Sequence, residues 1–228
     1  MKFAILVFPG SSCDVDMHHA INEVLGEKAE YVWHTEAKLE NYDAVVIPGG
    51  ASYGDYLRPG ALAKGSPAID SLLSFVESKK PVLGVGNGFQ ILTELHLLPG
   101  AFLQNKELLF NSGNAELVVQ NAESIFTSEY GKGQEITIPF AGQYGNYYVD
   151  EKTLAKLTKN GQIAFTYKDR NDNGSTDKIA GVLNEHGNVL GIMPLPERSI
   201  EEIIGGTDGL PLFKSILKRW NENNVSQS

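Results

Sequence analysis

The stretch Pro81-Val82-Leu83-Gly84-Val85-Gly86-Asn87-Gly88-Phe89-Gln90-Ile91-Leu92 joins a short apolar run, three closely spaced glycines and the start of a helical pattern. It predicts a buried strand that turns sharply into a helix. Gly84-Val85-Gly86-Asn87-Gly88 has the Gly-x-nucleophile-x-Gly spacing of a nucleophile elbow, whose glycines let strand and helix approach closely. The central residue here is Gly86, which has no side chain. The sequence therefore predicts a catalytic elbow without its reactive atom.

The length and composition favour one α/β domain spanning residues 1–228. The hydrophobic fraction of 42% and charged fraction of 21% are typical of globular proteins. A net charge of −9 argues against nucleic acid or an anionic membrane as the main partner. Cys13 is the single cysteine, so no internal disulfide can form. There is no signal-peptide pattern and no apolar run of ~20 residues, so we expect a cytoplasmic protein.

The residues around the elbow predict alternating strands and helices. Apolar runs that end at Pro-Gly or Gly-Gly predict parallel strands, and apolar residues at helical spacing predict the helices between them. The expected strands are 3–8, 31–33, 42–47 and 82–85, and the expected helices are 14–24, 67–79 and the one that follows the elbow. This alternation predicts a parallel sheet with helices on both faces.

The pattern changes near Leu108, after which strands follow one another through short turns such as 184–188. We expect these strands to form hairpins added to the parallel core. They are 116–119, 135–138, 162–167, 179–183 and 189–193, followed by a short helix after Arg198 and a last helix over 210–221.

Ligands of open α/β sheets bind beyond the C-terminal ends of the strands. The loops 48–56 and 193–198 should meet the elbow there, and the loop 139–146 is a further candidate. Backbone N–H groups of Gly49, Gly50 and Asn87 are suited to an oxyanion hole, because glycine allows close approach and a helix start leaves N–H groups free. The alternative for Gly49 and Gly50 is a plain tight turn.

Several long motifs together carry a family resemblance. They are 8–14 (FPGSSCD), 47–58 (IPGGASYGDYLR), 87–92 (NGFQIL), 187–194 (GNVLGIMP), 196–198 (PER) and 209–213 (GLPLF). Over nearly its whole length the chain resembles the glutamine amidotransferase subunits of phosphoribosylformylglycinamidine synthases. The resemblance implies a flavodoxin-like class I glutamine amidotransferase domain: a mostly parallel sheet flanked by helices, with added β-hairpin strands. It also implies that the partner is a large ATP-dependent synthetase subunit, with a possible small accessory subunit, and neither cofactor nor metal.

The resemblance breaks at the catalytic centre. In the family a cysteine thiolate attacks the glutamine amide, a histidine is the general base and a glutamate orients the histidine. Gly86 stands at the cysteine position and Leu195 at the histidine position, while Glu197 keeps the glutamate. Glycine offers no nucleophile and leucine exchanges no proton, so the family's glutaminase activity is predicted to be lost.

Other changes fall at the same site. The family's Ala-His-Gly-Glu-Gly is replaced by 141–145, with Gly142 and Tyr144 at the changed positions. Ala51 replaces an aromatic residue, whereas Gln90, close to the glutamine site in the family, is retained.

The remaining candidates have mainly structural interpretations. We expect Cys13 to be a small packed residue, and the five histidines, which lie outside the motif loops, to be structural or exposed. Without a histidine to orient, Glu197 should pair with Arg198, a lysine or backbone N–H groups. A carboxylate of raised pKa acting as a base with Tyr144 or Asp55 is the alternative.

Three hypotheses follow. The chain is a non-catalytic subunit that docks on the synthetase and stabilises it, a pocket repurposed for another small molecule, or an inactivated variant of an ordinary glutaminase.

Overall fold

The computed structural model describes residues 1–36 and 38–225. The chain up to the elbow helix contains β1 (Lys2–Val7), α1 (Asp14–His19), the π-helical η1 (Ala20–Val24), β2 (Lys28–Trp33), β3 (Ala44–Ile47), the 3₁₀ turns η2 (Ser52–Asp55) and η3 (Leu62–Gly65), α2 (Ala68–Glu77), β4 (Val82–Val85) and α3 (Asn87–Glu94). The remainder contains β5 (Ala101–Leu103), β6 (Asn111–Val119), β7 (Glu135–Gly142), β8 (Asn146–Tyr148), α4 (Glu151–Lys159), β9 (Ile163–Tyr167), η4 (Thr176–Lys178), β10 (Ile179–Leu183), β11 (Val189–Ile192), η5 (Pro196–Arg198), η6 (Glu202–Ile204) and α5 (Leu210–Val225).

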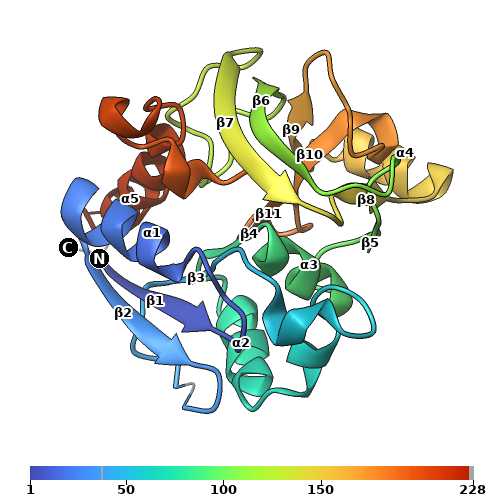
Figure 1. The fold of residues 1–228 in the computed structure, drawn as a ribbon. Helices are drawn as coiled ribbons and strands as arrows, with labels where there is room; N and C mark the ends of the chain where they lie inside the picture. The colour runs from blue at the N-terminus through green and yellow to red at the C-terminus, as the bar shows by residue number, and fades with distance from the viewer. Residues whose placement is uncertain (37, 226–228) are drawn as a thin grey trace.

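A nine-stranded sheet runs through the molecule in the order β2-β1-β3-β4-β11-β10-β9-β6-β7 (Figure 1). The strands from β2 to β11 pair in parallel, and those from β11 to β7 pair antiparallel. The fold expected from the sequence, a parallel core extended by hairpins, is thereby confirmed. It places the ends of β3, β4 and β11 next to one another at one edge of the sheet.

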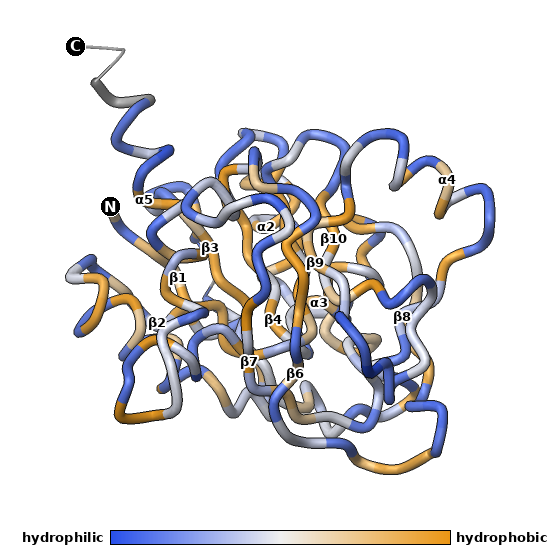
Figure 2. Tube along the Cα trace, turned by 90° about the horizontal axis from the view of Figure 1, so that it is seen from above, coloured by the Kyte–Doolittle hydropathy of each residue, from blue (hydrophilic) through white to orange (hydrophobic). Residues whose placement is uncertain are grey.

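The parallel strands are buried on both faces, which explains their continuous apolar sequences. Phe3, Ile5 and Val7 of β1 pack into one core with α1 and α5, whereas Ala4 and Leu6 pack into a second core with α2 and α3. This alternation follows from the two-residue period of a strand. Apolar residues accordingly concentrate along the central strands in Figure 2. Helices therefore cover both faces of the parallel half.

Several features differ from the expectation. Strand β6 begins at Asn111 and not at 116, and β7 continues as far as Gly142, into the expected loop 139–146. The short helix expected after Arg198 is only the 3₁₀ turn η6.

The helix predicted over 14–24 is α-helical to His19 and then widens into the π-helix η1. Helix α5 continues to Val225 instead of ending near 221. Helix α4 and the two-stranded sheet of β5 and β8 were not predicted, because α4 buries little besides Leu157 and each of these strands has three residues. None of the described helices is both long and apolar enough to cross a membrane.

Candidate functional site

The elbow has the predicted geometry. Strand β4 ends at Val85, α3 begins at Asn87, and Gly86 between them has φ 53° and ψ −109°. These angles lie outside the favoured regions for residues with a Cβ and are typical of strained functional turns. The Gly86 N–H donates to Ile192 O at 2.8 Å, and its carbonyl accepts from the N–H groups of Phe89 and Gln90. The turn is thus fixed by β11 on one side and by α3 on the other.

The glycines that flank the elbow are required by packing. A Cβ on Gly88 would lie 2.0 Å from the carbonyl oxygen of Ile47, and one on Gly84 would lie 2.5 Å from Leu92 Cδ1. In contrast, a Cβ on Gly86 would meet nothing closer than Leu195 Cδ2 at 3.5 Å. The position that carries the nucleophile in a reactive elbow therefore has room for a side chain, and this chain leaves it empty.

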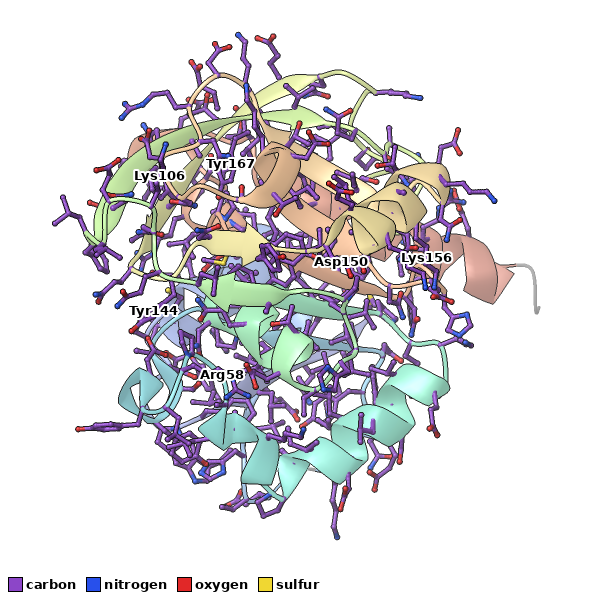
Figure 3. All side chains as sticks on the ribbon, turned by 90° about the vertical axis from the view of Figure 1, so that its right-hand side faces the viewer. Arg58, Lys106, Tyr144, Asp150, Lys156 and Tyr167 are labelled. Carbon is purple, nitrogen blue, oxygen red and sulfur yellow. The ribbon has the colours of Figure 1, made fainter. Side chains whose placement is uncertain are left out.

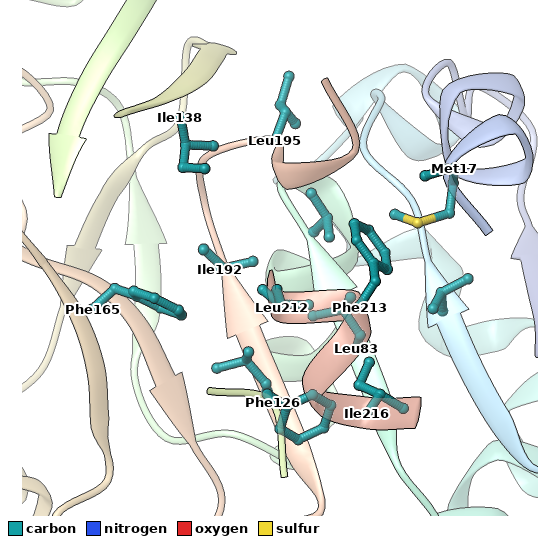
Figure 4. Close-up of a cluster of buried hydrophobic side chains, with 14 of the residues drawn as sticks. Met17, Leu83, Phe126, Ile138, Phe165, Ile192, Leu195, Leu212, Phe213 and Ile216 are labelled. Carbon is teal, nitrogen blue, oxygen red and sulfur yellow. The ribbon is translucent and has the colours of Figure 1, made fainter. Parts of the chain in front are cut away.

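Leu195 faces that empty position. It is buried and belongs to the same apolar cluster as Ile192, Leu212 and Phe213, as Figure 4 shows. Its N–H donates to Pro139 O at 2.8 Å, which holds the segment after β11 against β7. The side chain that faces the elbow is therefore a saturated hydrocarbon, which can neither accept nor donate a proton.

Glu197 follows Leu195 by two residues and has 1% of its surface exposed. Neither carboxyl oxygen has a hydrogen-bond partner, although its own backbone N–H lies near enough to favour the charged form slightly. Burial raises the pKa of Glu197 to about 8. Of the expected partners, Arg198 does not pair with Glu197, because the Arg198 Nε donates to Asp16 Oδ2 at 2.8 Å, and the backbone N–H near the carboxyl is that of Glu197 itself. Near neutral pH Glu197 is thus mainly an uncharged acid.

A cleft of about 540 Å³ opens at the elbow. Every site residue predicted from the sequence lines it, with the exception of Glu197. Phe110 also lines it and was missed, since its apolar neighbours follow neither a strand nor a helix pattern. The full lining is Gly10, Ser12, Cys13, Gly49, Gly50, Ala51, Asp55, Gly86, Asn87, Gln90, Phe110, Ala141, Gly142, Gln143, Tyr144, Met193, Leu195 and Arg198. A larger groove, of about 750 Å³, lies among α4, β6 and β9 and contains none of these residues.

An internal hydrogen-bond network ties the walls of the cleft together. Asn87 Nδ2 donates to Gln90 Oε1 at 2.9 Å, and Asn87 Oδ1 accepts from the Ser52 N–H at 3.1 Å. Gln90 Nε2 donates to Tyr144 O at 2.8 Å. The amides of Asn87 and Gln90 thus hold the loops 50–56 and 141–145 against α3, and Gln90 makes its bonds within the protein.

Asp55 is the carboxyl group in the cleft lining whose pKa is shifted from its ordinary value. Burial raises its pKa to about 6, and Asn87 Nδ2 donates to Asp55 Oδ1 at 3.4 Å. A carboxyl that titrates near neutral pH can accept or donate a proton at a ligand, so Asp55 is the one acid of the cleft wall with this capacity.

Gly49 and Gly50 make the close approach expected of them. A Cβ on Gly50 would lie 2.5 Å from Gly10 O, and the Gly49 carbonyl accepts from the N–H groups of Ser12 and Cys13. Within the described chain the N–H groups of Gly50 and Asn87 have no hydrogen-bond acceptor. Their role as oxyanion donors stays a prediction.

Cys13 is close to the elbow but is not activated. Its Sγ lies 3.1 Å from where a Gly49 Cβ would be, in a buried position. Burial, assisted by the charge of Glu197, raises the pKa of the thiol to about 11. Because the thiolate is the nucleophilic form, this cysteine is unreactive near neutral pH.

Histidines and metal ligands are not gathered at the cleft. No histidine is among the cleft residues given above, and the buried His34 has Nδ1 2.9 Å from the Ser66 hydroxyl. Within residues 1–36 and 38–225, no three His, Cys, Asp or Glu side chains form a cluster that could hold a metal ion.

Comparison with known proteins identifies relatives with the same fold. The family model of the CobB/CobQ-like glutamine amidotransferase domain matches residues 1–206. A chain of the structure of PurLQS from Thermotoga maritima is 42% identical, with a TM-score of 0.89, over 96% of this chain and 98% of that chain.

Two more distant structures share the fold alone. A putative GMP synthase protein from Thermoplasma acidophilum is 16% identical over 100% of this chain and 98% of its own, with a TM-score of 0.67. A glutamine amidotransferase from Thermotoga maritima is 13% identical over 100% and 85%, with a TM-score of 0.60. The chain, with its flavodoxin-like sheet and elbow, therefore belongs to the CobB/CobQ-like glutamine amidotransferase family.

Proposed function

We propose that this chain is a non-catalytic amidotransferase subunit of a formylglycinamidine ribonucleotide synthase-type complex of purine biosynthesis. The observation that carries the proposal is the elbow itself: Gly86 has no side chain, and Leu195 lies 3.5 Å from where one would begin. Amide hydrolysis by the family route needs a thiolate activated by an imidazole. In a serine protease, losing the nucleophile alone costs roughly six orders of magnitude in kcat.

Other side chains of the cleft do not replace the missing pair. The Cys13 thiol, with a pKa of about 11, is protonated near neutral pH. Asp55 can exchange a proton, with a pKa of about 6, but its hydrogen-bond partner is the Asn87 amide and not a hydroxyl or thiol that it could activate. Glu197 lies outside the cleft lining. We infer that glutamine is not hydrolysed and that the chain acts by docking.

The proposed partner is a large ATP-dependent synthetase subunit, and a small accessory subunit is a further possible component. Support comes from the relative at 42% identity, which is a chain of the PurLQS structure from Thermotoga maritima. In this proposal the chain stabilises the synthetase, which takes free ammonia or another amine in place of glutamine-derived ammonia. The proposal includes a cytoplasmic location, in keeping with a single cysteine.

The decisive experiment measures glutamate release from glutamine by the purified chain, alone and with a candidate synthetase subunit. We expect no turnover above a blank, stable co-purification with the synthetase, and synthesis that depends on added ammonium. Glutamate release at an ordinary enzymatic rate would refute the loss of activity, and failure to bind any candidate synthetase would refute the docking role.

A second test uses the double substitution Gly86→Cys with Leu195→His, which puts the family's cysteine and histidine back at these two positions. The room around the Gly86 position and the retained Glu197 are compatible with a restored triad. Recovered glutamine hydrolysis would show that the remaining site still accepts glutamine, which is the outcome expected for an inactivated variant of an ordinary glutaminase.

A second candidate function is supported by the open cleft. Its volume of about 540 Å³ lies in the range of small-molecule sites, and Asp55, Tyr144 and Arg198 supply polar groups beside the apolar Leu195. A repurposed pocket would therefore bind a compound other than glutamine. A thermal-shift screen of small metabolites tests it: stabilisation by a ligand that Asp55→Asn abolishes would support it, and absence of any hit would count against it.

A further inference from the structure

Asparagine followed by glycine occurs three times in the chain, at 87–88, 160–161 and 173–174. In this pair the asparagine side chain can cyclise onto the backbone, because a glycine, which has no Cβ, lets its backbone nitrogen approach the carbonyl carbon of the asparagine side chain. The three pairs lie in different parts of the fold. Their surroundings therefore determine which of them can react.

The first pair is held at the start of α3. Asn87 is 4% exposed, accepts from the Ser52 N–H at 3.1 Å and donates to Gln90 Oε1 at 2.9 Å. Gly88 is packed against β3, since a Cβ there would lie 2.0 Å from Ile47 O. Neither the side-chain amide nor the backbone of this pair has room to move, so cyclisation is blocked.

The third pair is enclosed in a similar way. Asn173 is 5% exposed, and its Nδ2 donates to the Tyr167 hydroxyl at 2.9 Å. The backbone nitrogen that would attack, that of Gly174, donates to Asn171 O at 3.0 Å. The Asn173 side chain also packs against Gly145, where a Cβ would lie 2.5 Å from Asn173 Nδ2. Cyclisation would have to break both hydrogen bonds and this packing.

The second pair is exposed. Asn160 is the C-cap residue of α4, and Gly161 after it has φ 63°. The Asn160 Nδ2 donates to Gln162 Oε1 at 3.2 Å, and the Gly161 N–H donates to Thr158 O at 3.2 Å. Both distances lie at the long end of the range for hydrogen bonds, so the contacts that hold this pair are weak.

The helix end that carries Asn160 can open at low cost. Helix α4 has nine residues, and among these described residues only Leu157 is buried. In Figure 3 the helix lies on the outside of the molecule, where Asp150 and Lys156 mark its course. The last turn of a short exposed helix unwinds locally while the core stays folded. Such an opening frees the Gly161 nitrogen to approach the Asn160 side chain.

We infer that Asn160 is a site of spontaneous deamidation, with water as the co-reactant. The Gly161 backbone nitrogen gives up its proton to solvent and forms a bond to Asn160 Cγ, while the bond between Cγ and Nδ2 breaks. The leaving nitrogen takes up a proton and departs as ammonia, and a succinimide ring remains. Water then opens the ring at either of its carbonyls and yields aspartate or isoaspartate.

The product adds a negative charge at the C-terminal end of α4. An anion is unfavourable there, because the negative end of the helix dipole lies at the C-terminus. Gly161 also lines the groove of about 750 Å³ among α4, β6 and β9, and Asn121 Nδ2 donates to Gly161 O at 2.6 Å. Isoaspartate lengthens the backbone next to this contact. Deamidation therefore changes the edge of the groove as well as the helix end.

The experiment incubates the full chain at pH 8 and follows each Asn-Gly peptide by mass spectrometry, through the gain in mass when an amide NH₂ is replaced by OH. Circular dichroism checks that the chain stays folded. We expect Asn160 to react at least about 10-fold faster than Asn87 and Asn173, because each of these must first break short hydrogen bonds. A parallel sample in urea is the control, in which the three pairs should react at similar rates.

The matched variant is Asn160→Gln, which keeps the amide but needs a larger ring to cyclise. Anion-exchange chromatography should show an acidic form that accumulates in the wild type and not in the variant. Equal rates at the three pairs in the folded protein would overturn the inference, as would an Asn160 that stays intact in the fold and reacts in urea. An acidic form that accumulates equally in the variant would place the reaction elsewhere and overturn it too.

Discussion

The unpaired carboxyl of Glu197 makes the stability of this chain depend on pH. Its pKa in the fold is about 8, against an ordinary value of 4.5. Between these values the folded protein holds a proton that the unfolded chain releases, so the free energy of unfolding falls as the pH rises. Below about 4.5 both states are protonated, and above about 8 both are ionised. The stability due to the neutral acid is therefore present at low pH and lost by about pH 8.

The size of this loss of stability follows from the difference between the pKa of Glu197 in the fold and its ordinary value. At roughly 1.4 kcal/mol for each pH unit, the loss between 4.5 and about 8 is on the order of 5 kcal/mol. Arg198 does not offset the cost of ionising Glu197 with a hydrogen bond, because the Arg198 Nε donates to Asp16. A loss of this size is comparable to the whole stability of many domains.

The assay is urea unfolding at pH 5, 6, 7 and 8 for the wild type, Glu197→Gln and Glu197→Leu. Neither variant can ionise, so the stability of each relative to the wild type should rise by roughly 1.4 kcal/mol per pH unit. Asp55, whose raised pKa also makes stability fall with pH, contributes equally to all three proteins and cancels in the difference. The control is Glu77→Gln, at the exposed end of α2.

The Leu variant separates charge from the missing hydrogen bonds. It removes the orphaned oxygens as well as the charge, so at pH 8 it should be the most stable of the three proteins. Wild-type and Glu197→Gln curves that stay parallel from pH 5 to 8 would refute the reasoning, since Glu197 would then be ionised in the fold at little cost.

Three further predictions concern the elbow and the cysteine. Gly86→Ala should fold but lose about 1–3 kcal/mol in urea unfolding, because its Cβ has room while φ 53° is strained; unchanged stability would contradict the strain. Gly88→Ala should be far more damaging, with a Cβ 2.0 Å from Ile47 O, and a soluble variant of near wild-type melting temperature would disprove that close approach. Alkylation of Cys13 by iodoacetamide at pH 7.5 should be slow in the native protein and fast in urea; rapid native labelling would show that its raised pKa and burial do not protect it.

Sequence patterns located the parallel core because its strands are buried on both faces. A run such as 3–8 has no polar position, and the run 82–85 leads into glycines that only a strand–helix turn requires. The hairpin strands were also predictable from their bounding turns. Helix α4 was missed because few of its residues are apolar, although Asp150 caps it and Leu154 and Leu157 lie at helical spacing. The π-helical second half of the first helix has no distinct residue pattern.

Most residues of the site could be predicted from the chain alone, with Phe110 as an exception, whereas the electrostatics of the site could not. The absence of a side chain at Gly86 and of an imidazole at Leu195 is a property of the sequence, and it held whatever the fold. The ion-pair partner of Arg198 depends on the tertiary structure. Folding places Asp16 Oδ2 of α1 2.8 Å from the Arg198 Nε and leaves the carboxyl oxygens of Glu197 buried without a hydrogen-bond partner. The pKa values of Glu197, Asp55 and Cys13 depend on burial, and burial is created by segments far apart in the chain. The sequence gives the type of each residue, but the desolvation of titratable groups and the pairing of charges are determined by the packed tertiary structure.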